Sequence, residues 1–363
     1  MRHLRKAQTL MVALALVVAA CGDGDAGEDA TTTVVDETTT TEVPDELTLM
    51  AHESFAEAVD DSTFGPFTEA TGITVDVLAS DDAGTLVNQA ALSADNPLAD
   101  VLFGVDDTFL SRAINEGIFR PHRSENLGTV PGDLHHPDDL VTPIDYGDVC
   151  FNYDKEWFES NDVVVPDDLE DLMTDEYAPY VTVEHPATSS PGLAFMLATI
   201  DNFGEDGWLD WWEQMRDAGV NVANDWNTAY YSDFTRYGGD SSMVMSYASS
   251  PPAEVIFSEE PLDVAPTGVI EAGCYRQVEY AGVLDGTEYP EAAGHLIDYM
   301  LSVEFQEMIP LNWFVFPTNQ EAELPQEFVE HTTIPESPTR LDADEIAENR
   351  DRWINEWIAV MQD

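Results

Sequence analysis

Basic residues are almost missing from this sequence. Thirteen lysines and arginines stand against 72 aspartates and glutamates, Lys6 and Lys155 are the only lysines, and the formal net charge is −59. Nucleic acid and anionic membrane surfaces are therefore poor partners. The acids are spread along the whole chain, and charge so diffuse does not mark a site. We interpret it as adaptation to salty surroundings, where screening shortens the range of electrostatic attraction.

Recognisable catalytic motifs are missing as well. No Ser-His-Asp arrangement, Walker loop or cluster of metal ligands stands out, and the adjacent His135 and His136 fall in a stretch rich in Pro and Asp. Each of those chemistries needs its residue types at a definite spacing. We therefore expect no enzyme activity, no cofactor and no metal site.

Long apolar runs are missing except near the N-terminus. Basic residues there precede an apolar run over residues 10–18, and small residues lead into Cys21. The run is too short to span a bilayer comfortably, and the arrangement is typical of an export signal. It resembles a bacterial lipoprotein signal, in which the cysteine is lipidated. We predict that residues 1–21 form this signal and that lipid on Cys21 anchors the protein to the outer face of the cell membrane.

Residues 22–46 lack aromatic side chains and consist mostly of Gly, Asp, Glu, Thr and Ala. Such a segment cannot bury enough apolar surface to offset the entropy of ordering. We predict a disordered, acidic, Thr-rich tether that leads to a folded body beginning near Leu47.

Cysteine is scarce, with three in the whole chain. Once Cys21 carries lipid, Cys150 and Cys274 remain in a compartment that permits disulfides. One pair in an exported chain is more often a bridge than two free thiols. We predict a disulfide between Cys150 and Cys274 that joins two strands crossing the fold.

The body alternates strand patterns with helix patterns. This alternation favours an α/β fold with parallel strands. Strands are expected over residues 47–52, 73–78, 99–105, 141–153, 180–183, 242–247 and 275–281. Helices are expected over 62–70, 83–93, 107–116, 191–202, 207–218, 290–301 and 303–308.

The body is longer than one core usually supports, so we expect two lobes. Strand-like stretches near 141–153 and 270–281 are predicted to cross between them. The predicted lobe 1 comprises residues 47–145 and 276–363, and lobe 2 comprises 146–275, with a ligand cleft between the lobes. A last helix begins near Asp342, and its helically spaced apolar stripe predicts core packing: Ile346, Trp353, Ile354, Trp357, Ile358 and Met361.

A set of short motifs follows the predicted strands. They are His52-Glu53-Ser54-Phe55-Ala56, Gly104-Val105-Asp106, Asp145-Tyr146-Gly147, Thr188-Ser189-Ser190-Pro191-Gly192, Trp226 with Ala229-Tyr230, Ser246-Tyr247 with Ser249-Ser250-Pro251, Trp313-Phe314, and Arg352 to Trp357. In this order and spacing the chain, from about residue 47 to 363, resembles the thiamine-binding proteins of ABC importers. The resemblance implies a type II periplasmic-binding-protein clamp with mixed sheets flanked by helices. The chain departs from the family's aromatic pattern at His52, Ala253 and Phe314.

The resemblance also implies a function. The protein would be an extracytoplasmic, monomeric binding lipoprotein that captures thiamine or its phosphates and delivers the ligand to an ABC transporter permease and its ATPase. Thiamine joins a flat pyrimidine to a cationic thiazolium, so aromatic faces and carboxylates suit it. The implied ligand-binding residues are His52, Glu53, Ser54, Asp106, Asp145, Tyr146, Thr188, Ser189, Ser190, Trp226, Tyr230, Tyr247, Trp313 and Phe314.

The turn from Thr188 to Gly192 has two interpretations. Pro191 at the first helical position, with Ser190 as N-cap, would aim hydroxyl and backbone N–H groups at an anion. In the family this turn contacts the phosphate or hydroxyl end of the ligand. The alternative is an ordinary helix cap.

Three other functions stay open. A pocket for a cation would also suit a polyamine or Fe³⁺, and the pair Tyr230-Tyr231 keeps iron under consideration. A thiaminase-like enzyme shares this fold and uses a cysteine in the cleft, which makes Cys150 a candidate. A disulfide with Cys274 would exclude that role, because a disulfide sulfur is no thiolate nucleophile.

Overall fold

The structure is a computed structural model that describes residues 43–362. The predicted signal, the lipidation of Cys21 and most of the predicted tether lie outside the described residues. Strand β1 (Glu46–His52) begins at the last residue of the predicted tether. No helix in residues 43–362 is long and apolar enough to cross a membrane.

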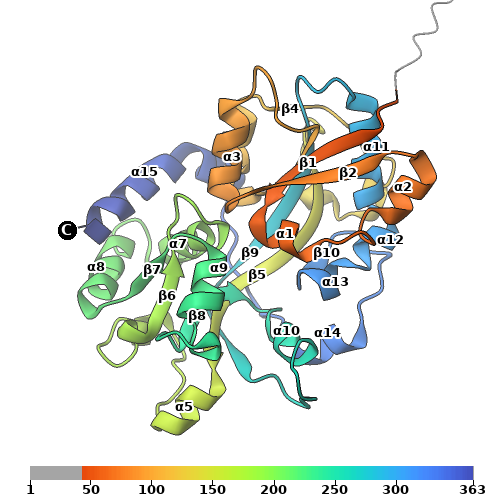
Figure 1. The fold of residues 1–363 in the computed structure, drawn as a ribbon. Helices are drawn as coiled ribbons and strands as arrows, with labels where there is room; N and C mark the ends of the chain where they lie inside the picture. The colour runs from red at the N-terminus through yellow and green to blue at the C-terminus, as the bar shows by residue number, and fades with distance from the viewer. Residues whose placement is uncertain (1–42, 363) are drawn as a thin grey trace, which may run out of the picture. The chain divides into compact units, whose positions relative to one another are not determined.

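Ten strands form one sheet (Figure 1). Its order is β2-β1-β3-β9-β5-β8-β6-β7, while β4 pairs with β9 and β10 pairs with β5. Besides β1, the bounds are β2 (Thr74–Ser80), β3 (Val101–Asp106), β4 (Phe119–Arg120), β5 (Thr142–Asp154), β6 (Val181–Glu184), β7 (Asn221–Ala223), β8 (Met243–Tyr247), β9 (Thr267–Leu284) and β10 (Phe316–Pro317).

The sheet is parallel toward its two ends and antiparallel in the middle. β1 runs parallel to β2 and β3, and β6 runs parallel to β7 and β8. β9 is antiparallel to β3 and β5, and β5 is antiparallel to β8. The expectation of parallel strands holds for β1, β2 and β3, whereas β5 and β9 in the centre are antiparallel to their neighbours. The mixed sheet flanked by helices agrees with the implied clamp.

Helices connect and flank these strands (Figure 1). Those expected from the sequence are found within a few residues of the expected bounds. They are α2 (Gly65–Thr71), α3 (Ala83–Leu92), α4 (Asp107–Asn115), α7 (Ser190–Phe203), α8 (Trp208–Ala218), α11 (Pro290–Met300), α12 (Val303–Gln306) and α15 (Ala343–Gln362). Shorter helices were not expected: α1 (Glu53–Ala58), α5 (Lys155–Asn161), α6 (Leu169–Leu172), α9 (Trp226–Thr228), α10 (Pro251–Ile256), α13 (Ile309–Asn312) and α14 (Gln326–His331).

The last helix, α15, packs as its apolar stripe predicts. Trp353 and Trp357 are buried, and the Trp357 ring meets Trp212 of α8 edge to face at 5.4 Å. Arg350 of the same helix lies 4.4 Å above the ring of Phe109 in α4. α15 therefore contacts elements of both predicted lobes, and the boundary between the lobes stays a prediction.

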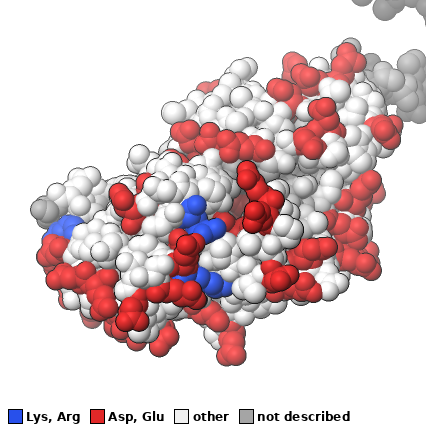
Figure 2. All heavy atoms as spheres, turned by 60° about the horizontal axis from the view of Figure 1, so that its bottom comes forward, with Lys and Arg blue, Asp and Glu red and all other residues white. Residues whose placement is uncertain are grey.

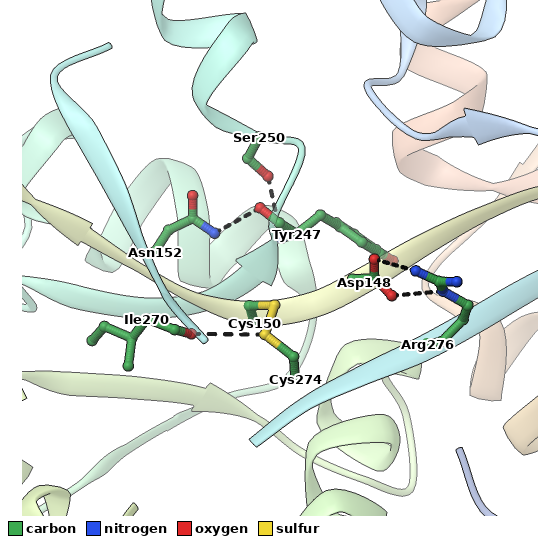
Figure 3. Close-up of a disulfide and its surroundings, with 8 residues drawn as sticks. All are labelled: Asp148, Cys150, Asn152, Tyr247, Ser250, Ile270, Cys274 and Arg276. Atoms are coloured by element: carbon green, nitrogen blue, oxygen red, sulfur yellow. Dashed lines mark hydrogen bonds and ion pairs between the residues drawn. A yellow bond between two sulfur atoms is a disulfide. The ribbon is translucent and has the colours of Figure 1, made fainter. Parts of the chain in front are cut away.

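The predicted disulfide is confirmed. Cys150 on β5 and Cys274 on β9 have bonded sulfurs and Cα atoms 4.5 Å apart. The two strands are neighbours, and their register shifts beside Cys150. Figure 3 shows a second link close by, in which Arg276 of β9 donates to both carboxylate oxygens of Asp148 at 2.8 Å. A covalent bond and an ion pair thus join the two central strands.

Acidic residues are scattered over the face drawn in Figure 2, and basic residues appear on it only in a few places. On this face the acidic residues are thus dispersed rather than gathered at one element. Salt adaptation stays a prediction.

Candidate functional site

A cavity of about 300 Å³ opens near the carboxyl ends of β1, β2, β6 and β8. Ligands of α/β sheets bind in such places, where the loops beyond the strands converge. Many predicted site residues line it: His52, Ser54, Ser190, Trp226, Tyr230, Tyr247, Trp313 and Phe314. The residues come from widely separated parts of the sequence, so the fold itself assembles the pocket.

His52 ends β1 and caps helix α1. Its Nδ1 accepts from the backbone N–H of Phe55 at 3.3 Å and lies 2.9 Å from the Ser54 hydroxyl. Its Nε2 faces Glu279 Oε1 at 3.6 Å. Gly104 makes room for the ring, since a Cβ there would approach His52 Cδ2 to 2.2 Å. The imidazole is thus held against one carboxylate at the pocket wall.

One wall of the pocket is aromatic, and Trp226 is its central residue. Its ring stacks on Tyr230, with centroids 5.1 Å apart and planes at 18°, and its Nε1 donates to Ser246 at 3.0 Å. Tyr230 belongs to a π-helical turn, a form of backbone often found at functional sites. The hydroxyls of Tyr230 and Tyr237 both donate to Glu254 at 2.9 Å. The wall is therefore fixed by stacking and by hydrogen bonds.

Trp313 and Phe314 provide further aromatic surface. Trp313 packs edge to face on Phe55 at 5.0 Å. Phe314 has φ of 57°, a left-handed conformation uncommon for a bulky side chain. The Ser249 hydroxyl donates to the Phe314 carbonyl at 2.6 Å and helps to hold this conformation. Such backbone strain is characteristic of binding sites.

Glu279 and Asp145 form a carboxyl pair behind the pocket. They lie opposite each other on β9 and β5. Glu279 lines the cavity, whereas Asp145 is fully buried and accepts from Trp313 Nε1 at 3.2 Å. Burial, reinforced by Glu279, raises the pKa of Asp145 well above its usual range. The pair therefore holds a proton more readily than two separate carboxyl groups.

Asp82 and Asp106 cap the helices that follow β2 and β3. Asp82 lines the cavity and accepts from the N–H of Ala83 at 2.9 Å. Asp106 is fully buried and accepts from the hydroxyl of Ser190. Burial raises the pKa of both, that of Asp106 to about 6 despite the lowering effect of Ser190 and Thr108.

The turn before α7 contributes less to the pocket than expected. The helix begins at Ser190, so Ser189 occupies the N-cap position, and its side chain makes no capping bond. The Thr188 hydroxyl donates to the carbonyls of His185 and Asn224, at 3.2 and 2.7 Å. Ser190 and Pro191 line the cavity, but Thr188 and Ser189 do not. The prediction that Ser190 is the N-cap of this helix is therefore wrong by one residue, because Ser189 holds that position.

Two other predicted residues lie outside the cavity lining. Tyr146 stacks on Phe316 at 5.2 Å, beneath the guanidinium of Arg276. Glu53 accepts from Asn227 at 3.4 Å and lines a smaller hollow beside the pocket. The Tyr146 ring thus packs between β5 and β10, and the Glu53 carboxylate links α1 to α9.

Several pocket residues were not identified from the sequence. They include Glu57, Asp82, Tyr237, Phe257 and Glu279. The position of Glu279 could have been inferred from the sequence. It falls in the predicted crossing strand 270–281, just as Asp145 falls in the predicted crossing strand 141–153. The position of Asp82 could not, since a single acid in so acidic a chain resembles solvated surface.

The charge of the pocket is of one sign. Glu57, Asp82 and Glu279 line it, and within residues 43–362 no lysine or arginine does. Across the same residues, no group of three or more His, Cys, Asp or Glu side chains is placed to hold a metal ion. Aromatic faces with carboxylates suit a flat organic cation.

The sequence of the chain is similar to those of known binding proteins. The thiamine-binding periplasmic protein of Escherichia coli (strain K12) is 29% identical over 319 residues, which cover 86% of this chain and 92% of that protein. Iron uptake protein A2 of Synechocystis sp. (strain ATCC 27184 / PCC 6803 / Kazusa) is 26% identical over 270 residues, 71% of this chain and 74% of that protein.

The fold is also similar to that of a solved structure. A periplasmic thiamin binding protein superposes with a TM-score of 0.78 at 27% identity, covering 87% of this chain and 96% of that one. Residues 96–349 match the family described as bacterial extracellular solute-binding protein. This match covers most of the folded body, and the chain therefore belongs to the family of bacterial extracellular solute-binding proteins.

Proposed function

We propose that this protein captures thiamine outside the cytoplasm and delivers it to an ABC transporter. The observation that carries the proposal is the combination, in one cavity, of aromatic faces with carboxylates and no basic side chain except His52 among the described residues. Thiamine presents the matching features, two flat rings and one permanent positive charge. The similarity to proteins named for thiamine binding supports the same ligand.

Each part of the ligand has candidate partners. Trp226, Tyr247 and Trp313 offer faces to the two rings. A desolvated cation–π contact with one of them contributes ~1–2 kcal/mol. Glu279 and Asp82 supply negative charge for the thiazolium or acceptors for the aminopyrimidine.

Iron is the strongest alternative, because Tyr230 and Tyr231 line the pocket together. Iron would require tyrosinate oxygens. The Tyr230 hydroxyl instead donates to Glu254, and burial, together with this carboxylate, raises its pKa well above the usual range. Both effects keep the proton on the phenol. A polyamine could also place its ammonium groups near the carboxylates and the aromatic faces, but it has no flat ring to stack on them.

The thiaminase-like alternative lacks its nucleophile. Cys150 is buried, bonded to Cys274 and absent from the cavity lining. The relatives are solute-binding proteins, and we propose that this chain is not an enzyme. We further propose a monomer anchored by lipid on Cys21, with a permease and its ATPase as partners.

Spectroscopy separates the candidate ligands. Thiamine should quench the tryptophan fluorescence of the purified protein, because Trp226 and Trp313 line the cavity. Ferric citrate should produce no visible tyrosinate absorption band, and spermidine should leave the fluorescence unchanged. A tyrosinate band without a response to thiamine would establish the iron alternative.

A further inference from the structure

We infer that Glu254 is a positioning residue through which the pocket prefers a cationic ligand to an uncharged one of the same shape. The inference rests on the proposed function and deepens it, since it assigns the selection for charge to a particular side chain. Glu254 lies on α10 and is absent from the cavity lining. It therefore acts on a ligand without touching it.

Glu254 holds two tyrosines of the aromatic wall with a single atom. The hydroxyls of Tyr230 and Tyr237 both donate to its Oε1, each at 2.9 Å. Both tyrosines line the cavity. The Glu254 side chain is only 7% exposed, so water screens its charge weakly. The carboxylate thus lies one hydrogen bond behind two rings of the pocket wall.

These two rings belong to a packed group of four that also includes Trp226 and Tyr231. Tyr230 stacks on Trp226 and lies 5.8 Å from Tyr237, and Tyr237 meets Tyr231 edge to face at 5.1 Å. All four residues line the cavity. Several aromatic rings gathered in this way are a typical receptor for a quaternary nitrogen. The phenols bonded to Glu254 are therefore part of the surface best suited to the thiazolium.

The bond to a carboxylate changes what these rings offer to a ligand. A phenol that donates to an anion is polarised, and its ring becomes richer in electrons. Cation–π attraction is electrostatic, so it grows with the negative potential of the ring face. Burial, together with Glu254, raises the pKa of Tyr230 and Tyr237, so both phenols keep the protons that they donate. The resulting gain requires a positive charge on the ligand.

Arg236 offsets the charge of Glu254 only in part. Its Nε lies 3.9 Å from Glu254 Oε2, and its Nη1 lies 3.9 Å from Glu156 Oε2. Both distances exceed the ~2.7–2.9 Å of a charge-assisted hydrogen bond. The phenols bind the other oxygen of Glu254, Oε1. Negative charge therefore remains available to polarise the two rings.

Calorimetric titration with thiamine and with an uncharged analogue, in which a thiophene ring replaces the thiazolium, tests the inference. Glu254→Gln keeps Oε1 as the acceptor for both phenols and removes the charge. It should weaken thiamine about three- to tenfold and leave the affinity for the analogue unchanged. Glu156→Gln is the matched control, because Glu156 lies equally far from Arg236 but is exposed and outside the cavity lining. It should leave both affinities unchanged.

Tyr237→Phe provides a second variant, which removes the hydroxyl and keeps the ring. Tyr237 is 47% exposed, so this change tests the inference without disturbing a buried side chain. It should reduce the preference for thiamine over the analogue. In Glu254→Gln protein the same change should have a much smaller effect, because the charge that polarises the ring is already absent. Additive effects of the two changes in a double-mutant cycle would contradict the inference.

The outcomes separate the inference from the proposed function. If the wild-type protein binds thiamine and Glu254→Gln weakens both ligands equally, Glu254 only holds the wall in shape. If Glu254→Gln changes neither affinity, Glu254 has no part in binding. Either result overturns the inference while the proposed function stands. If the wild-type protein binds neither thiamine nor the analogue, the proposed function fails and the inference fails with it.

Discussion

The imidazole of His52, at the end of β1, lies 3.6 Å from the carboxylate of Glu279 on β9, and both side chains line the pocket. Burial alone would lower the pKa of His52, but Glu279, with Asp82 and Asp106, raises it overall. A protonated His52 would compete with a cationic ligand for the charge of Glu279. The state of this pair therefore affects how strongly the pocket attracts a cation.

Thiamine affinity is expected to rise between about pH 6 and about pH 8, a range near the ordinary pKa of histidine. His52 loses its proton in this direction, and Asp106, with a pKa of about 6, completes its ionisation. Both changes make the pocket more negative toward a cation. Calorimetry at several pH values measures the trend, and an affinity that falls with rising pH would contradict it.

Trp226→Ala should weaken thiamine binding by about 2 kcal/mol, the loss typical of an aromatic anchor. The change removes a ring that lines the cavity and stacks on Tyr230. Trp157→Ala is the control, because this tryptophan packs on Tyr180 and Phe158, outside the cavity lining. Equal affinities for Trp226→Ala and the wild type would show that Trp226 has only a structural role.

The ligand-free protein should lose stability as the pH rises from about 4 to about 7. Burial raises the pKa of Asp106 to about 6 and that of Asp107 to about 7, against ~3.9 in an unfolded chain. The folded state thus retains protons that the unfolded state has lost, and this advantage disappears as the pH passes the folded-state values.

Urea denaturation across this pH range measures the effect on the free energy of unfolding. Asp106→Asn should reduce the slope, since the amide keeps the hydrogen-bonding shape but does not titrate. Asp76→Asn, exposed on β2, should retain the wild-type slope. A free energy of unfolding that increases with pH over the same window would be incompatible with the buried carboxyls as titrating groups.

Removing the disulfide by the double substitution Cys150→Ser, Cys274→Ser should destabilise the protein. The bridge closes a loop with a sequence separation of 124 residues, which corresponds to ~4–5 kcal/mol in the chain-entropy model. Urea denaturation of the two proteins gives the difference. Thiol titration of unfolded, unreduced Cys21→Ser protein should find no free thiol, and two thiols would disprove the bridge.

Much of the fold could be predicted from local patterns. The stripe with Trp353 and Trp357 identified the packed face of α15, and the scarcity of cysteine identified the Cys150–Cys274 bridge. The full extent of β9 could not be predicted. The sequence predicted a strand over residues 275–281 within a crossing stretch that begins near 270, whereas β9 runs from Thr267 to Leu284. Its first part includes Gly268 and Gly273, and glycine is unfavourable in strand interiors.

The aromatic residues of the pocket were easier to predict than its acids. Trp226 and Trp313 belong to short motifs, whereas Asp82 and Glu279 are two among 72 acidic residues. Their placement depends on non-local geometry. Glu279 faces Asp145 through the register of β9 on β5, and Asp82 precedes α3, which packs closely on Ala187 and Thr188 because residue 84 is glycine. Neither relationship is visible in sequence spacing.

Calorimetric titration of the wild-type protein with thiamine, beside spermidine and ferric citrate, tests the central claim most directly. The account predicts saturable binding of thiamine with a dissociation constant in the micromolar range or below, and no comparable heat from the other two ligands. No heat with thiamine or either of its phosphates, under conditions where the protein is folded, would contradict it.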